Sequence, residues 1–208
     1  RRRRMLVPAM SPTLDFYFFI GSTYSHLSVW RAAALAHERG VELVWRPFSV
    51  RTLMREQQNP PFVGKPVKMR YMWRDVERRA RRFGVPFAGE PPYPIDRDER
   101  ANHLAMRAAL DGWCPAFTRA AYHAWFIEHR DPGDEATLRA LIESTGHDPD
   151  TELAPARMAE CIAAYQRQTD RARELGLFGS PTFVCGREIF WGDDRLEDAL
   201  DWAVAAAH

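Results

Sequence analysis

The sequence predicts an α/β protein in which both ends of the chain contribute to one sheet and a long helical block is inserted between them. Strand-length apolar runs occur near the two ends, at 14–20, 41–45, 182–185 and 189–191. Between 49 and 176 the pattern is helical or irregular, and no strand signal interrupts it. The predicted order is therefore strand, helix, strand, helical block, strand, strand, helix.

The first unit is predicted to be a strand, a tight turn and a helix. The apolar run Leu14 to Ile20 has the character of a buried strand, and residues 21–25 form the turn. Helical periodicity then extends over 24–39, with Gly40 as the stop. Because the apolar run 41–45 follows as a second strand, these segments make a right-handed parallel crossover unit.

The middle of the chain is predicted to form a helical insertion domain over 49–176. It opens with an irregular stretch, 49–66, which is too long for a simple connection and is therefore expected to be functional. Helical patterns follow over 67–83, 97–110, 115–129, 134–144 and 155–175. The segments 14–48 and 177–208 are expected to form the sheet domain, and residues 1–13 a disordered leader.

Composition and cysteine spacing argue against several classes of protein. The 29 basic and 28 acidic residues nearly cancel, so neither nucleic acid nor an anionic membrane is an expected partner. No apolar stretch in the sequence has transmembrane length. Cys114, Cys161 and Cys185 are far apart, which argues against a disulfide framework, a dithiol centre and a zinc or other metal site. This cysteine usage is typical of the cytoplasm.

The turn at Ser22 is suited to an anion or a thiolate. A helix that begins there directs backbone N–H groups, and the positive end of its dipole, at a group above Ser22 and Ser25. The two serines have the spacing of the sulfurs in a C-x-x-C motif, but hydroxyls cannot carry dithiol chemistry. The alternative is that one serine only caps the helix.

Pro181 is the second feature of the predicted site. It directly precedes the short strand 182–185. In the predicted topology, a cis peptide bond at this position would face the turn at Ser22.

Five dispersed motifs give the chain a resemblance to a known family. They are Ser22-x-Tyr24-Ser25-x-Leu27; Pro47-Phe48; Asn59 with Pro66-x-Lys68-x-x-Tyr71-Met72-x-x-Asp75; Gly176-x-Phe178-Gly179-x-Pro181-Thr182-Phe183; and Phe190-x-Gly192-x-Asp194-Arg195-Leu196. From Leu14 on, the chain resembles the kappa-class glutathione transferases and the bacterial 2-hydroxychromene-2-carboxylate isomerases, relatives of DsbA. The resemblance implies a thioredoxin-like fold with an inserted all-helical domain, and a homodimer.

The resemblance also implies glutathione as cofactor. Ser22 would be the catalytic residue that bonds the glutathione sulfur. Residues expected to hold the tripeptide are Asn59, Lys68, Ser180, Pro181, Asp193 and Asp194. Three of them have simpler alternatives, because an asparagine between prolines forms turns, a lysine at a helix start is commonly exposed, and an aspartate there can be a cap.

Asp193 departs from the family pattern. A second carboxylate beside Asp194 would either repel a carboxylate of glutathione or point to solvent. The substrate pocket is expected to be lined by Tyr24, Ser25, His26, Tyr71 and Trp73, with Trp30, Phe117 and Trp125 as further aromatic candidates. Each of these aromatic side chains has a core position as its alternative.

The predicted function is that of a glutathione-dependent cis-trans isomerase acting on a small aromatic conjugated keto acid. In this hypothesis, glutathione is a nucleophile that is returned unchanged. Two alternatives stay open. A kappa-type glutathione transferase or peroxidase would consume the same thiolate, and a non-catalytic thioredoxin-like module would bind glutathione or a peptide without turnover.

Overall fold

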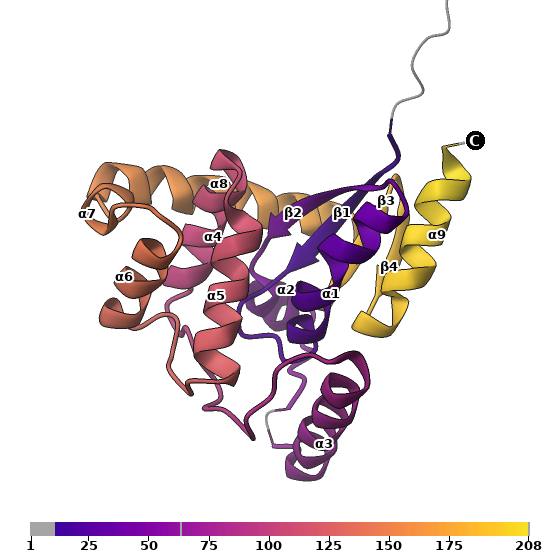
Figure 1. Cartoon of the computed structure of the whole chain (residues 1–208), viewed down its shortest axis with the longest axis horizontal. Coiled ribbons are helices and arrows are strands. Elements are labelled where there is room, and N and C mark those ends of the chain that lie inside the picture. Colours follow the sequence, from indigo (N-terminus) through magenta and orange to yellow (C-terminus); the bar gives the residue numbers. More distant parts are fainter. Residues whose placement is uncertain (1–10, 63, 208) are drawn as a thin grey trace, which may run out of the picture.

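The computed structural model describes residues 11–62 and 64–207 and contains a mixed four-stranded sheet (Figure 1). The strands are β1 (Thr13–Phe18), β2 (Glu42–Pro47), β3 (Thr182–Cys185) and β4 (Glu188–Trp191). Their order is β2-β1-β3-β4, with β2 parallel to β1 and β3 antiparallel to both β1 and β4. Segments from both ends of the chain therefore share one sheet, as the sequence predicts.

Helices form much of the rest of the described chain. They are α1 (Ser25–Glu38), α2 (Val50–Glu56), α3 (Pro66–Phe83), α4 (Arg100–Asp111), α5 (Cys114–Phe126), α6 (Glu135–Ser144), α7 (Pro149–Glu152), α8 (Pro155–Glu174) and α9 (Leu196–Ala206), with a 3-10 turn η1 (Asp193–Arg195) before the last. Helices α4 to α7 gather on the β2 side of the sheet (Figure 1). Among the described residues, no helix is long and apolar enough to cross a membrane.

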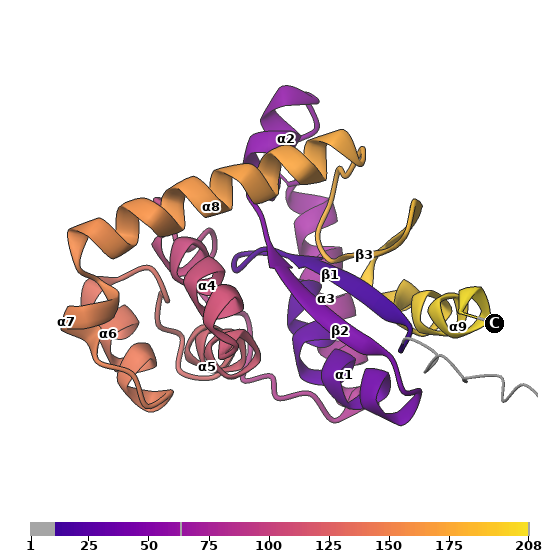
Figure 2. The same ribbon diagram turned by 90° about the horizontal axis from the view of Figure 1, so that it is seen from above.

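Strand β1 is buried on both faces because its side chains alternate between two cores. Phe16 and Phe18 belong to the larger core, which includes residues of α1, α4, α5 and α9. Tyr17 and Phe19 belong to a smaller core with residues of α2 and α8. Figure 2 shows the sheet between α8 on one side and α1 on the other. A strand with helices on both faces is expected to be mostly apolar, and β1 is apolar from Leu14 on except at Asp15, which is paired with Arg46.

Helix α2 corrects the prediction that 49–66 is irregular. Ser49 begins the helix, because its side chain accepts a hydrogen bond from the backbone N–H of Thr52. Val50 and Leu53 then pack into the smaller core. The helix has seven residues and only these two buried positions, too few to establish a helical period in the sequence.

Several element boundaries also differ from the predicted ones by one to three residues, among them the start of β1 and the start of α4. Thr13, assigned to the leader, is the first residue of β1 and pairs with Glu42 of β2; residues 1–10 lie outside the described residues. Helix α4 begins three residues later than predicted, because the carboxylate of Asp96 accepts hydrogen bonds from the backbone N–H groups of Ala101 and Asn102.

The helical segments share the larger core with the sheet. Asn102 of α4 extends this contact with polar bonds: its side chain accepts from the backbone N–H of Ile20 and donates to the carbonyl of the same residue, both at 2.8 Å. A fully buried amide thus completes the hydrogen bonding just after β1 ends. The division into a sheet domain, 14–48 and 177–208, and an insertion, 49–176, remains a proposal.

Candidate functional site

The turn after β1 is held by hydrogen bonds and by a glycine. The backbone N–H of Ser22 donates to the carbonyl of Phe19 at 2.9 Å. The Tyr122 hydroxyl lies 2.9 Å from the carbonyl oxygens of both Phe19 and Ser22. Gly21 has φ +124°, and a Cβ there would lie 2.7 Å from the Phe19 ring. Only glycine therefore fits this turn, which places Ser22 three residues before the first residue of α1.

Three serine side chains meet in front of this turn. The Ser22 hydroxyl donates to the carbonyl of Ser180 at 2.7 Å, and the Ser25 hydroxyl lies 2.8 Å from the Ser180 hydroxyl. The Ser180–Pro181 peptide bond is cis, as the sequence predicts. Helix α1 has Tyr24 as its N-cap and no side-chain cap, so neither Ser22 nor Ser25 only caps the helix.

A pocket of about 320 Å³ lies beside the serines. We call it the serine-side pocket; its lining residues are Tyr24, Asp75, Arg79, Ser180, Pro181, Trp191, Gly192, Asp193 and Asp194. The Trp191 indole lies so close to Gly179 that any Cβ there would clash with it. The pocket lies between α3, which contributes Asp75 and Arg79, and two chain segments, one just before β3 and one at the end of β4.

Neither of the two expectations for Asp193 holds, because its carboxylate does not point to solvent and is already paired with Arg79. It is 3% exposed, and both Nε and Nη2 of Arg79 donate to its Oδ2, at 2.9 and 2.6 Å. Burial raises the pKa of Asp193 to about 6, and the charge of Arg79 works against this rise. Asp194, next to it, is exposed, and its side chain does not cap α9.

A second pair closes the neighbouring wall. The Tyr24 hydroxyl donates to Asp75 Oδ2 at 2.9 Å, and Arg78 donates to the other oxygen of the same carboxylate at 3.1 Å. Burial and the adjacent Asp75 carboxylate raise the pKa of Tyr24 well above its usual value. Tyr24 is therefore a neutral hydrogen-bond donor at physiological pH, and its proton is already engaged.

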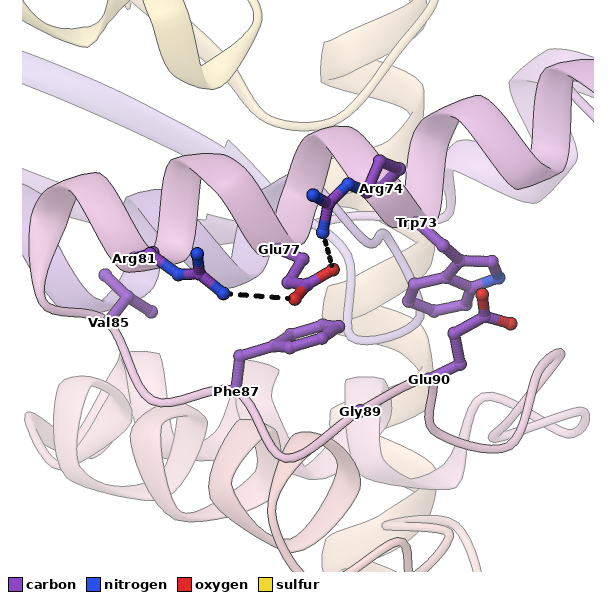
Figure 3. Close-up of a pocket in the computed structure, with 8 residues that line it drawn as sticks. All are labelled: Trp73, Arg74, Glu77, Arg81, Val85, Phe87, Gly89 and Glu90. Atoms are coloured by element: carbon purple, nitrogen blue, oxygen red, sulfur yellow. Dashed lines mark hydrogen bonds and ion pairs between the residues drawn. The ribbon is translucent and has the colours of Figure 1, made fainter.

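Several predicted residues lie away from this pocket. His26 is fully buried; its Nε2 lies 2.7 Å from the Pro86 carbonyl oxygen, its ring stacks on Phe126, and burial lowers its pKa to about 4. Tyr71 is 60% exposed, with Arg78 against its ring. Trp73 borders a different pocket, between α3 and the segment 85–90 (Figure 3).

Asn59 and Lys68, the two residues between α2 and the first turn of α3 that were expected to hold glutathione, also lie outside the serine-side pocket. Lys68 is exposed, with Nζ 5.6 Å from the Phe62 ring centroid, and Lys65 donates to the carbonyl of Pro60. Asn59 is exposed and its backbone N–H closes the end of α2 on Met54. Its neighbours Gln58 and Pro60 line another pocket, described below.

Sequence reasoning missed Asp75 and Arg79 as site residues. Both lie on the face of α3 that meets the turn, where Thr23 contacts Met72. The spacing of Met72, Asp75 and Arg79 places them on one side of a helix. That spacing was the available signal, but it was obscured by the many other arginines of α3.

Comparisons with known proteins establish the family. A model of the DsbA-like thioredoxin domain matches residues 13–202. The chain belongs to this family. It is 30% identical over 190 residues to a 2-hydroxychromene-2-carboxylate isomerase of Sphingobium xenophagum, a match that covers 90% of this chain and 96% of the relative. It is 22% identical to glutathione S-transferase kappa 1 of Caenorhabditis elegans, over 91% of this chain and 90% of that protein.

A solved structure gives the same picture. The structure of a 2-hydroxychromene-2-carboxylate isomerase superposes with a TM-score of 0.81 at 25% identity, covering 93% of this chain and 95% of the other. The α/β, thioredoxin-like fold and the family resemblance that the sequence predicts are thereby confirmed. The matches are spread over almost the whole chain and include named isomerases, which supports an enzyme of isomerase type.

Proposed function

We propose that the protein is a glutathione-dependent cis-trans isomerase that acts on a small aromatic conjugated keto acid. The isomerase names of its relatives support the reaction class, and the kappa-class relative supports glutathione as cofactor. The observation that carries the proposal is the Ser22 hydroxyl, which lies in the turn just before α1 and is bonded to the carbonyl of Ser180, 158 residues away and directly before Pro181. A cytoplasmic location and a homodimer are part of the same proposal.

The residues of the serine-side pocket fit the chemistry of glutathione. Ser22 is not part of the lining but is bonded to the lining residue Ser180, and it supplies a hydroxyl for the sulfur. Within the lining, Ser180 supplies backbone groups for the cysteinyl unit, and the exposed carboxylate of Asp194 suits the ammonium group. Arg79 uses Nε and Nη2 on Asp193, which leaves Nη1 for a ligand carboxylate. When bound, glutathione would supply a thiolate that adds to a conjugated carbon, permits rotation about the resulting single bond, and leaves.

Ser22 would act by reorienting one proton. A serine hydroxyl carries a single hydrogen, and in this structure it is donated to the carbonyl of Ser180. Rotation about the Cβ–Oγ bond would direct the hydrogen at the sulfur instead, and release the Ser180 carbonyl to accept from a backbone N–H of the tripeptide. The dipole of α1 adds to the stabilisation of a thiolate.

Calorimetric titration of glutathione into wild type and Ser22→Ala tests this role. In wild type, we expect binding to release a proton near neutral pH, because the site lowers the thiol pKa from about 8.5. In Ser22→Ala, we expect weaker binding without proton release. Ser28→Ala is the matched control, since Ser28 is a buried serine of the same helix whose hydroxyl has no partner in the described part of the chain.

Turnover separates the isomerase from its alternatives. With 2-hydroxychromene-2-carboxylate and saturating glutathione, we expect Ser22→Ala to slow isomerisation by about 100-fold or more, the usual cost of one donor to a developing anion. An undiminished rate would exclude this role for Ser22. Stoichiometric loss of glutathione would indicate a transferase or peroxidase, and affinity without turnover a binding module.

A further inference from the structure

A further pocket, of about 470 Å³, borders the residue that precedes Ser22 and is unused by the function proposed above. We call it the arginine pocket; its lining residues are Arg51, Met54, Arg55, Gln58, Pro60, Pro61, Arg97 and Glu99. They come from α2, from the segment after it and from the residues before α4. The volume is typical of a small-molecule site.

The charges of this pocket are not balanced within it. Most arginines of the described chain lie within 4 Å of a carboxylate, but Arg51, Arg55 and Arg97 do not, as far as residues 11–62 and 64–207 show. The one acidic residue of the lining, Glu99, is held at both oxygens, by the hydroxyls of Ser49 and Tyr165. The pocket therefore carries excess positive charge over its surface, which favours an anion.

Arg51 is held rigidly in its place. Its Nη1 and Nη2 donate to the carbonyls of Asp96 and Ile95, at 2.6 and 2.5 Å, and its guanidinium lies 4.7 Å from the Phe19 ring centroid. The backbones of two other lining residues, Gln58 and Glu99, have φ of +53° and +56°, a region that residues other than glycine rarely adopt. Because the Arg51 guanidinium is already fixed, its side chain loses no further conformational entropy when a ligand binds.

The lining of the pocket also includes three apolar side chains. Met54, Pro60 and Pro61 offer hydrocarbon surface beside the guanidinium groups. A planar ring can pack on the prolines and methionine while its carboxylate is held by an arginine in a bidentate pair. The combination is suited to an aromatic or conjugated carboxylate rather than to a compact inorganic anion.

The pocket borders the turn that carries Ser22. A Cβ on Gly21 would lie 3.3 Å from Arg51 Nη2, so the guanidinium is next to the residue that precedes Ser22. Asn102, which bonds both backbone groups of Ile20, also donates from its side-chain amide to Asp96 Oδ2 at 2.8 Å. The arginine pocket and the serine-side pocket thus both border the turn at residues 21–24.

We propose that the arginine pocket is the binding site for the carboxylate end of a planar, conjugated organic acid. Arg55 and Arg97 hold the carboxylate, Arg51 stabilises its charge from the base, and Met54, Pro60 and Pro61 pack against the conjugated plane. The assignment of this acid as the isomerase substrate rests on the function proposed above. The binding of the carboxylate itself does not, because it needs no glutathione.

Titration with trans-cinnamate, a planar conjugated carboxylate, tests the proposal. We expect wild type to bind cinnamate, to bind the uncharged cinnamyl alcohol much more weakly, and to lose cinnamate affinity as salt is added. Arg55→Gln and Arg97→Gln should each weaken cinnamate binding about tenfold, since each removes a charged hydrogen-bond donor. Both side chains are exposed, so the variants should fold.

Arg187→Gln is the matched control, because Arg187 is also an exposed arginine. It lies in the turn between β3 and β4, at the edge of the sheet opposite to β2, the strand that leads into α2 and the pocket. It should leave cinnamate binding unchanged. Cinnamate affinity that is equal in wild type, Arg55→Gln and Arg97→Gln, or absent from wild type, would overturn the proposal.

Glutathione titration of the same variants separates the two proposals. We expect Arg55→Gln and Arg97→Gln to bind glutathione like wild type. If they lose glutathione as strongly as cinnamate, the pocket belongs to the tripeptide and the present proposal is wrong. If cinnamate binds in an arginine-dependent way but glutathione does not bind to wild type, the carboxylate site stands and the proposed glutathione chemistry fails.

Discussion

The two pockets that border the Ser22 turn differ in whether their charged side chains are paired. In the serine-side pocket, Arg79 is paired with Asp193, and Asp75 is bonded to both Tyr24 and Arg78. In the arginine pocket, none of the three guanidinium groups has a carboxylate within 4 Å among the residues that the structure describes. Paired charges hold the walls of a pocket, and Arg79 keeps only Nη1 for a ligand, whereas a charge without a carboxylate partner remains available for one.

The difference has an energetic basis. A buried carboxylate without a partner is costly, so Asp193 needs Arg79 wherever the fold places it. An exposed arginine keeps its hydration and needs no carboxylate partner. Arg55 and Arg97 can therefore remain unpaired without lowering the stability of the fold. The comparison therefore predicts that similar changes of charge have different consequences in the two pockets.

The largest expected effect is on stability, at Arg79. Arg79→Met leaves Asp193 buried and unpaired, and we expect the free energy of unfolding to fall by about 3 kcal/mol. Arg55→Gln, the matched change in the other pocket, should alter it by less than about 0.5 kcal/mol. Urea denaturation at neutral pH measures both values, and equal effects would contradict the distinction.

A double variant sharpens this result. Arg79→Met with Asp193→Leu removes both charges, and it should recover most of the lost stability because no uncompensated charge remains. Failure to recover would show that the side chains contribute through packing rather than through their charges.

The next effect is a pH dependence that arises from Asp193. Its pKa is raised to about 6 in the folded protein, above the value near 3.8 of an unperturbed carboxyl. Between about pH 4 and 6 the folded state therefore binds more protons than the unfolded state, and this group makes the free energy of unfolding fall as pH rises, by about 2–3 kcal/mol at most.

The difference between wild type and Asp193→Asn isolates this contribution. Wild type should lose stability relative to the variant as pH rises from about 4 to 6, and the difference should be constant above about pH 7. The subtraction is needed because Asp96, also raised to about 6 by burial, acts in the same sense, and His26, lowered to about 4 by burial, acts in the opposite sense. A flat difference would mean that Asp193 is ionised throughout.

The smallest expected effect concerns the second pair of the serine-side pocket. Tyr24→Phe removes the hydroxyl that donates to Asp75, and we expect a loss of about 1 kcal/mol in the free energy of unfolding. Asp75 keeps its bond to Arg78, so the carboxylate is not left alone. Tyr71→Phe on the exposed face of α3 is the control and should be neutral in chemical denaturation; a neutral Tyr24→Phe would show that the pair is not stabilising.

Much of the fold follows from local patterns in the sequence. The apolar run of β1, the helical period of α1 and the glycine stops depend on neighbours within a few residues, and each is found where it is expected. The place of Pro181 could also be predicted, because it follows from the order of strands and helices. Helix α2 was missed because its signal is two buried residues in seven.

The two pockets depended on contacts that no local pattern contains. Arg79 and Asp193 are 114 residues apart, and Ser22 and Ser180 are 158 apart. In the sequence, Asp193 is a second carboxylate beside Asp194, and Arg79 is one of many arginines in its helix, so nothing in the sequence pairs the two.

The sequence by itself thus determined the α/β architecture, the family and the position of Ser22 in the turn before α1, because these depend on residue order and short-range periodicity. The tertiary structure decided which charges are neutralised and which are not. That distinction is set by burial, since the free energy of a charged group depends on the solvent and the partner that the folded chain provides.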